Sequence, residues 1–201
     1  MTINEKSVKD IISYRVAQAN SVLNKKNSEY THQGNRYFAF FKGADILNEY
    51  PEQTLMGYMV KHTTSVIQLM DQAEKTPDSL RRGAYDPIID EKVGDQFNYL
   101  FILLGMLNRT QDIGVFTRSK NLVNNLTKAV EGNLDDIMRP DFEYSIKYLD
   151  TQINNYYSRY NPNSRYRPIL LEDLITEVWT AIEVTMTQEV LLRKAENKDD
   201  R

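Results

Sequence analysis

The side chains most able to do chemistry in this chain form an acidic line, Glu91, Asp95 and Asn98, which leads into a strongly apolar segment. On a helix of about 3.6 residues per turn these three residues share one face. The opposite face is apolar, with Val93, Phe97, Leu100, Leu104 and Leu107. Asn98 is the only strongly polar side chain between Phe97 and Leu107, and a helix that is apolar on nearly every side is expected in the middle of a bundle. An unpaired buried amide costs about 1 to 3 kcal/mol, so the acidic line and Asn98 predict the wall of a polar pocket.

A histidine in the preceding helical pattern adds a second candidate group. His62 lies on the same stripe as Leu55, Met59, Val66 and Leu69, which places it on the face that packs into the core. One interpretation is a neutral imidazole held by a neighbour in the core. The other is a hydrogen-bond partner or base that faces Glu91 and Asp95, with Lys61, one position round the helix, reaching a phosphate from the same side.

The elements that must position these residues are helices. Apolar residues recur at helical spacing, no alternating strand pattern persists, and no repeat with a period of roughly 20 to 50 residues occurs. Pro51 and Glu52 suit the first turn of a helix, and Arg15 and Gln18 fall on the polar flank of the first amphipathic pattern. We predict an all-α helical bundle of about seven helices, at about residues 4–26, 37–44, 52–74, 86–107, 113–138, 142–160 and 169–193.

Composition narrows the class of protein further. The 201 residues suffice for one good-sized domain or two small ones, and the absence of cysteine excludes disulfides and thiolate metal sites. No apolar run of about 18 residues and no leader pattern occurs, so we expect a soluble, cytoplasmic protein without a membrane partner. A net charge of −3 with short, scattered basic spots argues against nucleic acid as a partner, and two histidines are too few for a histidine-rich metal site.

The motifs resemble those of a known group of proteins, small helical proteins of bacteriophages. That group is related to the MazG-like, all-α nucleoside triphosphate pyrophosphohydrolases and to the phage domains called nucleotide-modification-associated. The resemblance covers about residues 8–108 and implies a MazG-like four-helix core at 1–110, followed by a helical extension at 111–201. The extension either packs on the core or binds a partner, and one continuous domain is the alternative. The matching residues, in order, are Lys26-Asn27-x-Glu29-Tyr30, Asn35 to Lys42, Lys61-His62-x-x-Ser65 and Glu91-x-x-Gly94-Asp95-x-x-Asn98-Tyr99.

The resemblance also implies an activity. In the family, acidic residues on two helices hold Mg²⁺ against a nucleoside triphosphate, and water cleaves between the α and β phosphates to release pyrophosphate. Magnesium neutralises the phosphate charge, and an acidic group orients the water. Asp95 matches the aspartate of the family's E-x-x-D motif, although Lys92 stands where the glutamate is expected and Glu91 comes one residue earlier. The family's earlier pair of glutamates has no match, since the corresponding helix offers Lys61, His62 and Ser65.

Three hypotheses for function follow. The first is a phage-type nucleotide-binding protein, or a Mg²⁺-dependent pyrophosphohydrolase. The second is a non-catalytic phage protein that binds and inhibits a host protein, favoured by the missing carboxylates and by a tyrosine cluster in the second half of the chain. The third is an acidic stripe with a purely structural role, capped by Lys61 and Lys92. Under the first hypothesis Glu91, Asp95 and His62 are catalytic, Glu91 and Asp95 hold Mg²⁺, and the substrate-binding residues are Lys26, Asn27, Glu29, Tyr30, Lys42, Lys61, Asn98 and Tyr99.

Self-association is expected under either of the first two hypotheses. The last helical pattern carries Val178, Trp179, Ile182 and Met186, which is more apolar surface than one small bundle needs. We therefore expect a homo-oligomer.

Overall fold

A computed structural model describes residues 14–15, 17–18, 21–22, 37–75, 86–107, 142–159 and 167–196 of the chain. Every element in these ranges is an α-helix, so the predicted all-α class is confirmed. The predicted helix at 113–138 and most of the one at 4–26 lie outside the described residues, and the count of seven stays a prediction. The elements are α3 (Phe38–Leu47), α4 (Pro51–Lys75), α6 (Asp86–Leu107), α8 (Phe142–Ser158) and α9 (Arg167–Glu196), with further helical residues at 14–15, 17–18 and 21–22.

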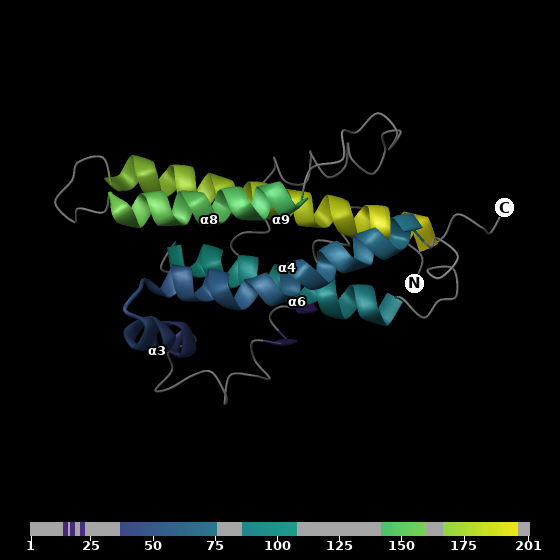
Figure 1. Cartoon of the computed structure of the whole chain (residues 1–201), viewed down its shortest axis with the longest axis horizontal. Coiled ribbons are helices and arrows are strands. Elements are labelled where there is room, and N and C mark those ends of the chain that lie inside the picture. The colour runs from purple at the N-terminus through teal and green to yellow at the C-terminus, as the bar shows by residue number, and fades with distance from the viewer. Residues whose placement is uncertain are drawn as a thin grey trace.

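Two antiparallel helix pairs form the body of the molecule. Helix α6 runs back along α4, and α9 runs back along α8, as Figure 1 shows. The pairs pack face to face, with α6 against α9 and α4 against α8, while α3 lies against α4 at the end where α4 begins. Within the described ranges, α4, α6, α8 and α9 thus form a four-helix bundle, against which the short α3 packs.

Local sequence fixes the turn between α3 and α4. Helix α3 ends at Leu47 and is capped by Asn48, which adopts the left-handed conformation with φ 56° and ψ 48°. The backbone N–H of Tyr50 then donates to the Gln53 side chain at 3.0 Å, and the N–H of Gln53 donates back to the Tyr50 carbonyl at 2.9 Å. This reciprocal cap lets α4 begin at Pro51, with Glu52 in its first turn, as the sequence predicts. The turn therefore sets how α3 lies on α4.

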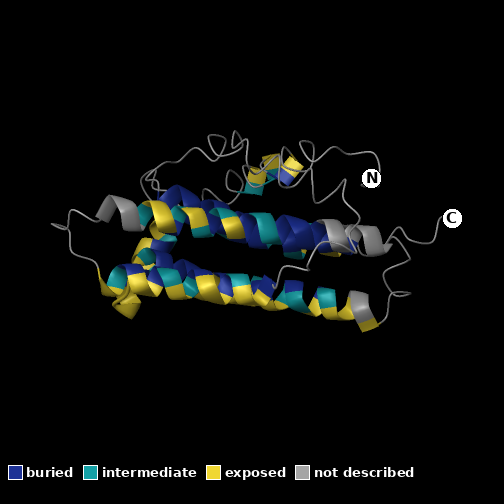
Figure 2. Cartoon of the chain, turned by 90° about the horizontal axis from the view of Figure 1, so that it is seen from above, coloured by how far each residue is buried: buried dark blue, intermediate teal, exposed yellow. Residues whose placement is uncertain are grey.

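Helix α6 lies at the centre of the core, which confirms its predicted place. Val93, Leu100, Leu103 and Leu104 have no exposed surface at all. Buried residues line the sides on which the helices face one another, as Figure 2 shows. A single hydrophobic cluster extends from Phe40 to Leu192, so residues on both sides of the predicted boundary at 110 share one core. The boundary itself falls in 108–141, outside the described ranges.

The apolar face of α9 is used inside the bundle. Val178, Ile182 and Met186 are buried within the chain, and Trp179 is half-buried against the same core. The reason given for self-association, an apolar surplus on this last helix, is therefore wrong, because α6 and α8 cover that face. No helix among the described residues is long and apolar enough to cross a membrane.

Candidate functional site

The predicted meeting of His62 with the acidic line occurs at the edge of the α4–α6 pair. His62 Nδ1 lies 3.2 Å from Asp95 Oδ2, with 18% of the histidine and 32% of the aspartate side chain exposed. The imidazole also packs against the Tyr99 ring, with 5.0 Å between the ring centroids. Carboxylate and tyrosine together fix the orientation of the imidazole at a half-exposed position.

Glu91 is held by the lysine next to it in the chain. Lys92 Nζ donates a hydrogen bond of 2.6 Å to Glu91 Oε1. This bond and the charge of Lys92 lower the pKa of Glu91, and the charges of Lys61 and His62 lower it further. The same hydrogen bond raises the pKa of Lys92. Glu91 is thus an exposed carboxylate at neutral pH that is paired with Lys92.

These carboxylates do not complete a magnesium site within the described part of the chain. Asp95 is paired with His62 and Glu91 with Lys92, and no group of three or more Asp, Glu, His or Cys side chains among the described residues is arranged to hold a metal. Mg²⁺ is usually held by one or two carboxylates together with waters, and here both carboxylates are already engaged, Asp95 by the His62 ring and Glu91 by Lys92. Glu29, the further carboxylate, lies outside the described ranges. The Mg²⁺ site therefore stays a prediction.

A buried polar pair lies one position further along both helices. Thr63 Oγ1 donates to Gln96 Oε1 at 3.1 Å, and Gln96 is completely buried. The Nε2 group of Gln96 has no hydrogen-bond partner within the described structure. Asn98 is buried as predicted, but the amide with an unpaired donor is Gln96. The sequence did not predict this burial, because nothing in the pattern around Gln96 indicates that another helix packs on that side of α6.

The other residues that were predicted to bind substrate do not all lie at the α4–α6 edge. Lys61 is exposed beside His62 and close enough to Glu91 to affect its pKa. Tyr99 is half-buried between His62 and Phe40, whose ring centroid lies 6.4 Å away. Lys42 is exposed on α3. Lys26, Asn27, Glu29 and Tyr30 lie outside the described residues. The structure thus brings together His62, Asp95, Tyr99, Glu91 and Lys61.

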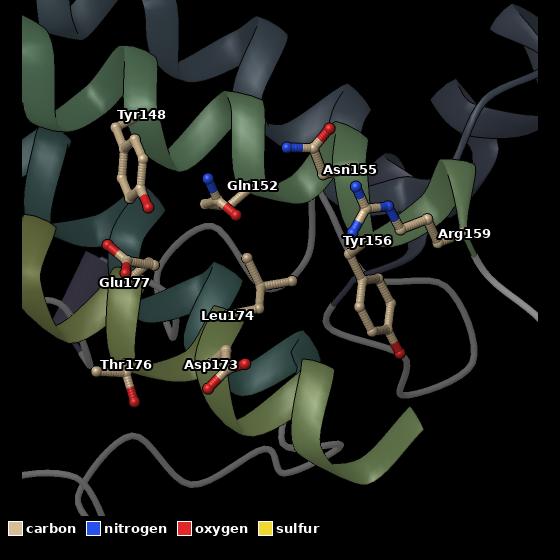
Figure 3. A pocket seen from close by; sticks show the side chains of 9 residues that line it. All are labelled: Tyr148, Gln152, Asn155, Tyr156, Arg159, Asp173, Leu174, Thr176 and Glu177. Carbon is tan, nitrogen blue, oxygen red and sulfur yellow. The ribbon is translucent and has the colours of Figure 1, made fainter. Parts of the chain in front are cut away.

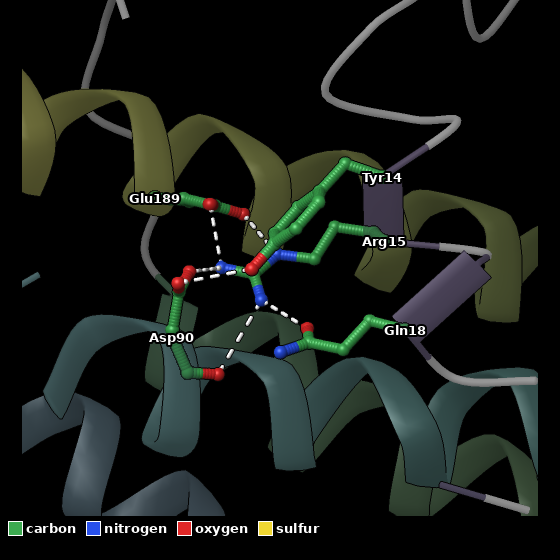
Figure 4. Close-up of polar contacts among 5 residues, drawn as sticks. All are labelled: Tyr14, Arg15, Gln18, Asp90 and Glu189. Carbon is green, nitrogen blue, oxygen red and sulfur yellow. Dashed lines mark hydrogen bonds and ion pairs between the residues drawn. The ribbon is translucent and has the colours of Figure 1, made fainter. Parts of the chain in front are cut away.

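A second polar cluster, centred on Arg15, was not predicted (Figure 4). Its guanidinium group donates to both carboxylate oxygens of Glu189, from Nε at 2.8 Å and from Nη2 at 2.6 Å. It also bonds Asp90 Oδ1 at 3.2 Å and Gln18 Oε1 at 2.5 Å, while Tyr14 donates its hydroxyl to Asp90 Oδ2 at 3.0 Å. The Arg15 side chain is completely buried and lies 5.7 Å from the centre of the Phe97 ring.

Arg15, predicted to lie on the polar flank of its helix, is buried instead, because α6 and α9 cover it, while Gln18 stays partly exposed. Asp90 is 75 residues and Glu189 is 174 residues away in the chain, so helical periodicity cannot pair them with Arg15. One signal was available: Thr187, Gln188 and Glu189 form a polar run in an otherwise apolar stretch of the last helix. Because the buried Arg15 is hydrogen-bonded to both α6 and α9, it is suited to fixing the position of its own helical segment against these two helices.

The α4–α6 edge remains the arrangement best suited to binding a ligand. It combines an oriented imidazole, an exposed lysine, a second lysine paired with an exposed glutamate, and an aromatic ring. Such groups recognise phosphate by charge and a base by stacking. No protein-family model, curated protein or solved structure matches this chain.

Proposed function

We propose that the protein binds a nucleotide, or another phosphate-bearing small molecule, at the α4–α6 edge. The observation that carries this proposal is the His62–Asp95 pair, 3.2 Å apart at a half-exposed position, with Tyr99 packed on the imidazole and Lys61 alongside. Asp95 acts here as a positioning residue, because it orients the ring that contacts the ligand.

Two lysines supply the charge for the phosphate groups. Lys61 is exposed on α4, and Lys92 has a third of its side chain exposed and pairs with the exposed Glu91. An incoming phosphate can replace the exposed Glu91 carboxylate as the partner of Lys92, because both partners form charge-assisted hydrogen bonds and the phosphate also contacts Lys61. The phosphate end of the ligand therefore lies over Lys61 and Lys92.

The base lies on the aromatic side of the edge. Tyr99 forms a continuous group of rings with Phe40, and the exposed Tyr58 adds to it, with 5.9 Å between the Phe40 and Tyr58 centroids. Stacking on an aromatic side chain contributes about 1 to 3 kcal/mol per base and tolerates different bases. Tyr58 is therefore the platform for the base, while Tyr99 holds His62 in place.

A more specific version of this proposal is that the protein also hydrolyses the bound nucleoside triphosphate and releases pyrophosphate. It needs Mg²⁺ on Glu91 and Asp95 and at least one further carboxylate, for which Glu29 is the candidate. Bound Mg²⁺ would neutralise the phosphate charge there. Because Asp95 is engaged by the His62 ring and Glu91 by Lys92, binding is the function that the geometry supports best.

Titration with ordinary and modified deoxynucleoside triphosphates, with and without Mg²⁺, tests the proposal. We expect a saturable rise in the melting temperature, measured by a thermal-shift assay, and pyrophosphate release is assayed in the same samples. Lys61→Ala is expected to weaken binding about tenfold, equivalent to about 1.4 kcal/mol.

The matched control is Lys75→Ala, in the last turn of the same helix, where the lysine pairs only weakly with Asp71 at 3.5 Å. It is expected to leave nucleotide affinity unchanged. If no nucleotide shifts the melting temperature, the proposed binding function is wrong.

A second function, association with a protein, is favoured by the outer face of α3. Phe38, Phe41 and Ile46 are exposed on it, and Ile46 has 74% of its surface in solvent. The same face carries the exposed Lys42 and Asp45. If two copies of α3 pack antiparallel about a two-fold axis, Lys42 of each copy lies opposite Asp45 of the other. This self-complementarity favours a second copy over a host protein as the partner.

Light scattering after gel filtration tests this association. We expect a concentration-dependent dimer that Lys42→Glu weakens by juxtaposing like charges and that Lys42→Glu with Asp45→Lys restores. A monomer at every concentration would exclude the α3 dimer. Nucleotide binding is measured on the same variants, because Lys42 is also a predicted phosphate contact.

A further inference from the structure

A cavity of about 280 Å³ lies between α8 and α9, away from the α4–α6 edge. Tyr148, Gln152 and Arg159 line it from α8, while Asp173, Leu174 and Glu177 line it from α9 (Figure 3). Its volume is close to the lower end, about 300 Å³, of the usual range for ligand pockets. It suits a molecule of a few heavy atoms rather than a nucleotide.

The cavity has an excess of negative charge. Asp173 and Glu177 are one helical turn apart on α9, and neither has an ion-pair partner among the described residues. Burial and the charge of Asp173 both raise the pKa of Glu177. A cation bound beside Glu177 would favour the ionised carboxylate, because its positive charge offsets both the loss of water and the repulsion from Asp173.

Residues on α8 complete the environment of Glu177. Figure 3 shows the Tyr148 hydroxyl and the Gln152 side chain reaching towards Glu177, with Arg159 at the opposite end. Gln152 offers a carbonyl oxygen as an acceptor, and the Tyr148 ring offers a face that attracts an ammonium group. Arg159 follows the last residue of α8 and lies at the end of the cavity opposite Glu177.

The floor of the cavity is apolar. Leu174, which is almost fully buried, lies between the two carboxylates in the sequence and contributes its side chain to the lining. A short methylene chain can rest on it while ammonium groups at its two ends reach the carboxylates. We propose that this cavity binds a small aliphatic diamine, with one ammonium group at Glu177 and Tyr148 and the other at Asp173.

Three compounds of equal chain length test the proposal by titration calorimetry on the full chain at low salt. They are 1,4-diaminobutane, 4-aminobutanoate and 1,4-butanediol. The diamine is expected to bind best, the amino acid at least tenfold more weakly because Asp173 repels its carboxylate, and the diol not at all. Diol binding equal to that of the diamine, or no binding of the diamine, overturns the proposal.

Variants locate the site. Glu177→Gln is expected to weaken diamine binding at least tenfold, and it should fold, because Glu177 is only partly buried and has no ion-pair partner among the described residues. The matched control is Glu172→Gln, an exposed glutamate on the same helix that is not part of the lining. Arg159→Gln is expected to tighten the diamine and to weaken 4-aminobutanoate further. Equal diamine affinity in Glu177→Gln and the wild-type protein overturns the assignment.

Discussion

At the residue scale, the most consequential side chain is Arg15. Its side chain has no exposed surface, and it lies between Glu189, also buried, and Asp90, which is one-third exposed. Two carboxylates, a glutamine and the Phe97 ring surround one guanidinium group, so the charge is removed from water but fully hydrogen-bonded. Removing one member of such a cluster lowers the stability of the folded protein strongly, since the remaining groups stay in place without that partner.

Replacing Arg15 is therefore the most severe single change that we predict. Arg15→Met should lower the free energy of unfolding by about 3 to 5 kcal/mol, measured by urea denaturation, because Glu189 stays buried without the guanidinium group that balances its charge. Adding Glu189→Leu should recover most of this loss, because the buried charge is then gone. Lys147→Met is the control, since its exposed ion pair with Glu143 contributes less than about 1 kcal/mol. Equal effects of Arg15→Met and Lys147→Met would contradict this account of the cluster.

At the scale of single elements, α4 and α6 differ in how closely other segments approach them. A Cβ atom added at Gly94 of α6 would lie 3.0 Å from Gln18 Oε1 and 3.1 Å from Arg15 Nη1. A Cβ atom at the exposed Gly57 of α4 would meet nothing within 4 Å. Gly94 is therefore required by the close approach of the Arg15 cluster, whereas Gly57 is not required by packing.

Alanine at these two glycines should act in opposite directions. Gly57→Ala is expected to stabilise the protein by about 0.5 to 1 kcal/mol, because alanine is the better helix former. Gly94→Ala gains the same propensity but displaces hydrogen bonds to a charged group worth about 1.5 to 3 kcal/mol, so a net loss is expected. Urea denaturation of both variants measures the difference. A gain at Gly94 as large as that at Gly57 would show that the cluster tolerates displacement.

Sequence patterns predict which stretches are helices better than they predict which side chains meet. The boundaries of α4 and α6 follow from Pro51, Asp86 and the apolar stripes, and the meeting of His62 with Asp95 follows because the two helices are neighbours in sequence. Arg15 was misplaced because periodicity identifies a polar face but not the distant helix that covers it. The α8–α9 cavity depends on the register of two helices, which their individual patterns do not specify.

At the scale of the whole molecule, the two helix pairs carry different chemistry around one shared core. The α4–α6 pair presents cations and aromatic rings at its edge, while the α8–α9 pair presents an acidic cavity. The outer face of α3 is apolar with a self-complementary pair of charges. A phosphate-bearing ligand and a diamine would therefore be bound at separate places, and each site can be changed without altering the other.

The central claim is that the α4–α6 edge binds nucleotides through Lys61 and His62. Titration calorimetry with deoxynucleoside triphosphates tests it most directly, on the wild-type protein, Lys61→Ala and Lys75→Ala. The account predicts saturable binding that Lys61→Ala weakens about tenfold and Lys75→Ala leaves unchanged. Absence of binding to the wild-type protein, or equal affinity in Lys61→Ala, would contradict it.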